Sequence, residues 1–199
     1  MSASGTLKTE RRAKARHATR ASILEAARRV AARDGARNLS LRGVAAEAGF
    51  APAALYGYFA GKDELLLALA ADDLSSLAKA MRAAAAGGRA DGLSAAIGAA
   101  LSQMKDMETM AAAAAALTSV PGSSEPERHF NGRLIAALNA LSDASGKRAE
   151  SREAQCDVLL LAAALTGLAV FSRSGRLAAL GFAHEELLKR LEAGFKAGM

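Results

Sequence analysis

Residues 40 to 62 read SLRGVAAEAGFAPAALYGYFAGK, and this stretch decides the fold. Ser40 is a good N-cap, and Gly49 suits the left-handed turn that ends many helices. Between them, apolar residues recur at intervals of three and four: Leu41, Val44, Ala45 and Ala48. The spacing predicts a short helix with one apolar face.

A second helix is predicted to begin near Pro52, because proline is well tolerated in the first turn of a helix. Leu55 and Phe59, four residues apart, are its apolar anchors. The small side chain of Ala45 and the absence of a side chain at Gly49 let the two helices approach closely. The pattern indicates a helix-turn-helix, whose second helix enters the major groove of DNA. An ordinary helical hairpin in a protein core is the alternative for this spacing alone.

An upstream helix can complete a three-helix core. It has Asp34-Gly35 at its end, and its apolar face holds Ile23, Ala26, Ala27, Val30 and Ala31. Charge supports the DNA interpretation. Residues 1–60 contain 11 Lys and Arg against 4 Asp and Glu, whereas residues 61–199 contain 15 against 16. Positive charge gathered around such a motif favours phosphate binding.

Residues from about 16 to 66 resemble the N-terminal DNA-binding domain of the TetR family of transcriptional regulators. The resemblance is carried by Ser40-Leu41-Arg42, Val44-Ala45, Ala48-Gly49-Phe50, Leu55-Tyr56, Tyr58-Phe59, Lys62 and Glu64-Leu65. It implies an all-α fold in which a three-helix DNA-binding domain precedes a larger helical domain for ligand binding and dimerisation. The expected divisions are a basic arm at residues 1–15, the DNA-binding domain at 16–62 and the helical domain at 63–199.

The resemblance also implies roles for single residues. Ser40 and Arg42 match positions that touch the DNA backbone or a base edge, and arginine is well shaped for guanine. Tyr56 and Tyr58 match an aromatic pair that contacts phosphate or nearby bases, with packing as the alternative for Tyr58. Lys62 matches a phosphate-binding lysine.

The predicted recognition helix has few hydrogen-bonding side chains. Many relatives carry polar residues where this chain has Ala51 and Gly57. Pro52, Ala53 and Ala54 offer small apolar surfaces that can meet thymine methyl groups but cannot donate or accept. We therefore expect discrimination to come from Arg42, Tyr56, methyl contacts and DNA shape.

The segment before the first helix is small, polar and basic, and no apolar signal-peptide region follows it. It spans residues 1–20, and its cations are Lys8, Arg11, Arg12, Lys14, Arg16 and Arg20. Such a segment is either a disordered solubilising tail or a flexible arm that reaches DNA backbone or minor groove. The arm is the preferred interpretation.

Beyond Lys62 the pattern is helical throughout, interrupted by loop chemistry at Val120–Pro126. The uncharged run from Val158 to Phe171 is too short to span a bilayer and is typical of a buried helix. Cys156, the single cysteine, is expected to be a buried thiol in a reducing cytoplasm. The last two long helices are expected to form a dimer interface, as the resemblance implies, although their apolar residues could equally be internal core.

A possible effector pocket is the least defined feature. Met104, Met107 and Met110 form a stripe that could line a pocket for an apolar ligand. His129 and Phe130, beside the loop at Val120–Pro126, could add a polar group and a ring, although a lone histidine is more often a surface or capping group. Core packing is the better explanation of the methionine stripe.

The expected function is a dimeric repressor that binds a palindromic DNA operator in the cytoplasm and is released by a mainly apolar small molecule. The alternative is a DNA-bound adaptor whose helical domain recruits a protein. No catalytic motif, metal-ligand spacing or cofactor signature is present in the sequence, so neither an enzyme nor a metal or cofactor site is expected, and no membrane association is predicted.

Overall fold

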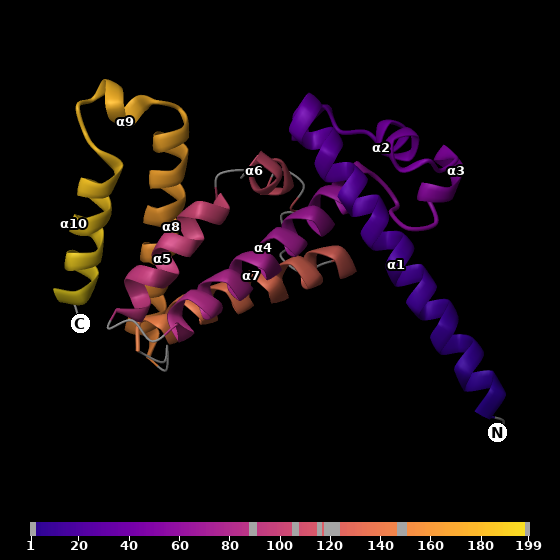
Figure 1. Ribbon diagram of the computed structural model, residues 1–199, viewed down its shortest axis with the longest axis horizontal. Coiled ribbons are helices and arrows are strands. Elements are labelled where there is room, and N and C mark those ends of the chain that lie inside the picture. Colours follow the sequence, from indigo (N-terminus) through magenta and orange to yellow (C-terminus); the bar gives the residue numbers. More distant parts are fainter. Residues whose placement is uncertain are drawn as a thin grey trace. The chain divides into compact units, whose positions relative to one another are not determined.

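The computed structural model describes residues 3–87, 91–104, 108–114, 117, 124–146 and 151–197. Across these ranges the chain is helical and contains no strand, which confirms the all-α prediction. The α-helices are α1 (Ala3–Asp34), α2 (Leu41–Ala48), α3 (Pro52–Leu55), α4 (Lys62–Ala86), α5 (Gly92–Gln103), α6 (Glu108–Ala114), α7 (Glu125–Ala144), α8 (Arg152–Arg173), α9 (Arg176–Ala179) and α10 (His184–Ala197) (Figure 1).

The chain divides into two compact units. The first unit comprises Met1–Ala70 and Glu108–Phe130, and the second comprises Ala71–Met107 and Asn131–Met199. The division falls inside α4, eight residues after the boundary proposed from sequence, and the first unit also takes in α6 and the start of α7.

The core of the first unit forms around the C-terminal half of α1. Every residue of the predicted apolar face is buried there: Ile23, Ala26, Ala27, Val30 and Ala31. Leu55 and Phe59 are 0% and 1% exposed. Figure 1 shows α2 beside this half of α1 and α3 next to α2. The three-helix core predicted from sequence is therefore present.

The N-terminal half of α1 differs from the prediction. The sequence predicts a disordered tail or a flexible arm before the first helix, at residues 1–20, but α1 begins at Ala3, so residues 3–20 are helical. Eight of residues 3–15 are Ala, Lys, Arg or Glu, which have high helix propensity, and they continue the packed half of α1. Side chains 7–18 are all exposed. In Figure 1 this part of α1 extends beyond α2 and α3 as a single helix.

The predicted turn chemistry of the motif is confirmed. Ser40 caps α2, with its hydroxyl oxygen accepting a hydrogen bond from the Gly43 N–H at 3.1 Å. Gly49 ends α2 in the left-handed region at φ 72° and ψ 27°. Pro52 lies in the first turn of α3. The chain therefore reverses between α2 and α3 as the residues predicted.

The loop predicted at Val120–Pro126 ends earlier than expected. Residues 120–123 lie outside the described ranges, but Glu125 and Pro126 belong to the first turn of α7, where proline needs no partner for its nitrogen. A capping box explains the early start. The Glu127 N–H donates to Ser124 Oγ at 3.3 Å, and the Ser124 N–H donates to Glu127 Oε2 at 3.4 Å.

In the second unit, α8 packs against α5, α9 and α10. Its inward side chains are buried: Val158, Leu161, Leu165, Leu168 and Ala169. The other side is apolar as well, and Leu159, Leu160, Val170 and Phe171 are 52%, 68%, 56% and 47% exposed. The prediction of a buried helix is therefore wrong. Among the described residues, α5, α9 and α10 pack against α8, and these four apolar side chains of α8 remain exposed.

Cys156 lies on the exposed side of α8, so the prediction of a buried thiol is also wrong. By length and composition, α8 is the one helix among the described residues that could cross a membrane. A single such helix is weak evidence, because core helices of soluble proteins meet the same criterion.

Candidate nucleic-acid interface

The motif presents its polar side chains from one short segment of the first unit. Arg42 follows the Ser40 cap on α2, and both side chains are exposed. Residues 51–54, which open α3, are exposed too, while Leu55 fixes α3 to the core. The small side chains of Pro52, Ala53 and Ala54 are thus available at the surface where a helix-turn-helix meets DNA.

The two tyrosines lie in different environments. Tyr56 is 60% exposed, as its predicted outward position requires. Tyr58 is half-buried, with the guanidinium carbon of Arg16 4.9 Å from its ring centroid. Most of the Tyr56 side chain is therefore accessible to a partner, whereas the Tyr58 ring is in contact with the Arg16 guanidinium.

Lys62 is held in place by the backbone. Its Nζ donates to the carbonyl oxygen of Arg37 at 2.5 Å, and the side chain is half-buried. An ammonium group carries three donors, so this contact orients the charge and leaves further N–H groups for an anion. Lys62 thereby ties the start of α4 to the turn that follows α1.

The basic residues of α1 separate into two groups. Lys8, Arg11, Arg12 and Lys14 are exposed along the projecting half of the helix. Arg16 instead donates from Nη2 to the carbonyl oxygen of Gly57 at 2.8 Å. The structure thus brings Arg16 to the recognition segment. The sequence did not predict the contact between Arg16 and Gly57, although both residues fall in the predicted DNA-binding domain.

Arg20 makes a second contact of the same kind, which the sequence analysis did not predict. Its guanidinium carbon lies 5.0 Å from the ring centroid of Phe59. Arg16 and Arg20 are one helical turn apart, and Tyr58 and Phe59 are adjacent. The sequence signal that could have indicated these contacts is an arginine pair one helical turn apart, together with an adjacent pair of aromatic residues in the same domain.

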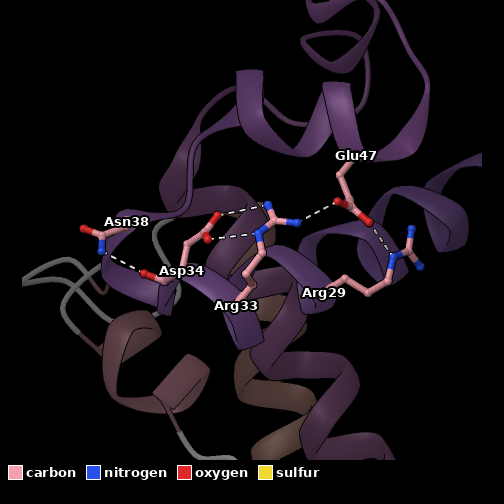
Figure 2. A network of polar contacts seen from close by, with 5 residues as sticks. All are labelled: Arg29, Arg33, Asp34, Asn38 and Glu47. Atoms are coloured by element: carbon pink, nitrogen blue, oxygen red, sulfur yellow. Dashed lines mark hydrogen bonds and ion pairs between the residues drawn. The ribbon is translucent and has the colours of Figure 1, made fainter.

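A polar network joins α2 to the end of α1 (Figure 2). Glu47 accepts hydrogen bonds from Arg29 Nε at 2.7 Å and from Arg33 Nη1 at 3.0 Å. Arg33 also binds both carboxylate oxygens of Asp34 at 3.0 Å, and Asn38 Nδ2 donates to the Asp34 carbonyl at 2.8 Å. Sequence analysis singled out none of these side chains as functional.

The arginines of this network change the titration of its acids. Hydrogen bonds from Arg29 and then Arg33 lower the pKa of Glu47 below its ordinary value. The hydrogen bond from Arg33 likewise lowers the pKa of Asp34, and the two acids raise the pKa of Arg33. Glu47 and Asp34 are therefore ionised at neutral pH, where the Glu47 carboxylate joins α2 to the arginines of α1.

The candidate effector residues fall in different units. Met104 is buried at the end of α5 in the second unit. Met110 is half-buried on α6, and on α7 His129 is exposed and Phe130 is 5% exposed, all in the first unit. Met107 lies outside the described residues. The described residues therefore define no single pocket from this set.

A capped helix, a glycine turn and an exposed second helix, placed beside a basic helix, define a helix-turn-helix DNA-binding protein. Comparison with known proteins agrees. The sequence profile described as bacterial regulatory proteins, tetR family, matches residues 23–69. No protein with a curated description matches the chain.

Solved structures cover most of the chain. SCO4313, described as a candidate regulatory protein, is 28% identical, with 92% of this chain and 96% of that chain covered at a TM-score of 0.66. A TetR-family transcriptional regulator from Streptomyces coelicolor is 17% identical, with coverage of 90% and 96% and a TM-score of 0.61. The regulator FadR from Bacillus subtilis, solved in complex with stearoyl-CoA, is 18% identical, with coverage of 89% and 98% and a TM-score of 0.61.

The protein has the fold of a TetR-family transcriptional regulator, and the helix-turn-helix domain of that family occupies residues 23–69.

Proposed function

We propose that this protein is a homodimeric repressor that leaves its operator when a small molecule binds the second unit. The observation that carries the proposal is the continuity of α4. This 25-residue helix begins at Lys62, beside the recognition segment, and ends at Ala86 in the second unit. A change in the second unit that moves α4 would change the spacing of two recognition helices on DNA.

The DNA contacts proposed are Ser40, Arg42, Pro52, Ala53, Ala54, Tyr56, Tyr58 and Lys62. Exposure of Arg42 and Tyr56 supports them as the principal readers. Exposed Lys8, Arg11, Arg12 and Lys14 support a phosphate-binding role for the first half of α1. A helical arm would follow the DNA backbone as a fixed row of charge rather than as a flexible chain.

The homodimer is proposed to form through α8 and α10. Exposed Leu159, Leu160 and Val170 support this interface, and Ala163 and Gly167 among them allow a close approach of two helices. A two-fold dimer presents the same surface from both subunits. Its operator is then a palindrome with half-sites about one DNA turn apart.

The effector is proposed to be a mainly apolar small molecule. FadR of Bacillus subtilis shares the fold and was solved with stearoyl-CoA, which makes long-chain acyl compounds a reasonable first class to test. Met104 is a buried apolar side chain of the second unit that such a ligand could contact. The other candidates from the sequence are Met110, His129 and Phe130, which lie in the first unit, and Met107, which lies outside the described residues. To move occupancy from nearly full to nearly empty, the ligand must prefer the released state by about 5 kcal/mol.

Selection from a randomised DNA library tests the central proposal. We expect the purified chain to enrich one palindromic site and to bind it as two chains per duplex. Stearoyl-CoA and stearate are then added to the complex. Release of the DNA supports an acyl effector. If the DNA stays bound and another small molecule stabilises the protein, the effector belongs to another chemical class. Stabilisation only by a protein favours the adaptor alternative. Equal binding to all sequences would contradict the proposal.

A further inference from the structure

The recognition helix is too short to fix its own position. α3 contains only Pro52–Leu55, and short helices gain little from internal hydrogen bonds. The turn after it is closed by the Gly57 N–H on the Ala54 carbonyl at 3.2 Å and the Tyr58 N–H on the Leu55 carbonyl at 2.9 Å. Leu55 and Phe59 hold one side of this segment in the core. The exposed side, which carries Tyr56, needs another support.

Arg16 supplies contacts on that outer side. One guanidinium group donates to the Gly57 carbonyl oxygen and lies over the Tyr58 ring, so it holds two consecutive residues of the turn. One helical turn later, Arg20 lies over the ring of Phe59. Both arginines project from α1, which is continuous through these positions. The turn is therefore attached to a long helix by two side chains at i and i+4.

The chemistry of this contact is specific to arginine. A planar guanidinium can donate through its edge while its face lies on an aromatic ring. A lysine ammonium can reach the carbonyl but has no plane to stack. Arg16 is exposed, as is Arg12 one turn earlier, but Arg16 contacts the Gly57 carbonyl and the Tyr58 ring. The two residues have the same charge and different surroundings.

We propose that Arg16 is a positioning residue for DNA recognition: its guanidinium holds Gly57 and Tyr58, and thereby fixes the orientation of Tyr56 and α3, without itself contacting phosphate. The proposal rests on the DNA-binding function proposed above. By its charge alone, Arg16 would belong to the phosphate-binding basic arm. The proposal instead gives Arg16 the role of holding α3 and the turn that follows it in position.

The test compares Arg16→Ala and Arg16→Lys with the matched control Arg12→Ala. Affinity is measured over a range of salt concentrations, on the selected operator and on a scrambled duplex of equal length. Arg16→Ala should weaken operator binding about tenfold, with a smaller effect on the scrambled duplex and an unchanged salt slope. Arg12→Ala should lower the salt slope by about 0.9 on both duplexes, as expected when one phosphate contact is lost.

The free protein supplies an independent signal. The chain has no tryptophan and two tyrosines, Tyr56 and Tyr58, both in the reading segment. Near-ultraviolet circular dichroism of tyrosine should therefore change in Arg16→Ala and Arg16→Lys, and stay constant in Arg12→Ala. Far-ultraviolet spectra and unfolding curves establish that each variant is folded.

Two results would overturn the proposal. One is a salt slope lowered by about one unit in Arg16→Ala with an unchanged tyrosine signal, which would make Arg16 a phosphate contact. The other is full recovery of affinity and signal in Arg16→Lys, which would show that charge alone suffices. If the wild-type chain bound no DNA, the proposed function would fail, and the tyrosine signal would still report whether Arg16 holds the turn.

Discussion

The first unit buries the apolar anchors of α3 and the turn after it within one chain, whereas in the described part of the second unit one apolar side of α8 is exposed. Leu55 and Phe59 are at most 1% exposed, while Leu160 on α8 is 68% exposed. Polar contacts follow the same division. In the first unit, arginines of α1 bind the turn after α3 and the carboxylate of Glu47 on α2. The comparison indicates that the DNA-binding fold can form from one subunit, and that the second unit needs another surface against α8.

The largest expected effect concerns the uncovered side of α8. Leu160→Glu should convert a dimer into a monomer, because each dimer would bury two unpaired charges at a cost of about 4 kcal/mol or more. Light scattering during size-exclusion chromatography measures the mass. Ile135→Glu on α7 is the control, since Ile135 is 57% exposed and outside α8. A wild-type monomer, or equal effects of both substitutions, would remove the contrast between the units.

Shortening Leu55, the buried anchor of α3, should destabilise the first unit whether or not the protein dimerises. Leu55→Ala should lower the free energy of unfolding by about 3 kcal/mol, because Leu55 is fully buried and its removal leaves a cavity. Leu7→Ala, at a position 60% exposed on α1, should change it by less than about 0.5 kcal/mol. Denaturant unfolding measures both. Similar losses would mean that α3 is not anchored as the structure describes.

Arg42 tests sequence reading by the first unit. Arg42→Ala should weaken binding to the selected operator by about 1–3 kcal/mol and relax the preference at one base pair. Titrations on operator variants measure this, and Arg176→Ala removes the same charge from α9 as a control. An equal loss on every sequence would identify Arg42 as a phosphate contact only.

The smallest expected effect concerns Glu47 and pH. Because arginine hydrogen bonds lower the pKa of Glu47 in the folded protein, its ionised form stabilises the fold above its ordinary pKa of 4.5. That contribution disappears as pH falls through the lowered folded value. Glu47→Gln should thus reduce stability slightly at neutral pH. The difference from wild type should shrink as pH falls below 4.5 and vanish once pH is below the lowered folded pKa. Thermal unfolding across this range tests it, with the more exposed Glu25→Gln as control; a difference that persisted at low pH would contradict the ion-pair explanation.

Local residue chemistry was sufficient to predict the motif. The capping and turn roles of Ser40, Gly49 and Pro52 involve only backbone groups a few residues away, so these roles follow from residue type and spacing. The buried face around Ile23 followed from helical periodicity. Arg16 on Gly57 could not be predicted in the same way, because it joins positions 41 residues apart and depends on how α1 lies beside the turn.

The sequence by itself determined the all-α class, the helix-turn-helix and the excess of positive charge around it, because these depend on short-range periodicity and composition. Only the tertiary structure decided that residues 3–15 continue α1, that Cys156 and one side of α8 are exposed, and that Arg16 supports the reading segment. An apolar helix has the same sequence pattern whether its second side meets its own chain or a partner. Packing makes that distinction, since it depends on where the other helices lie.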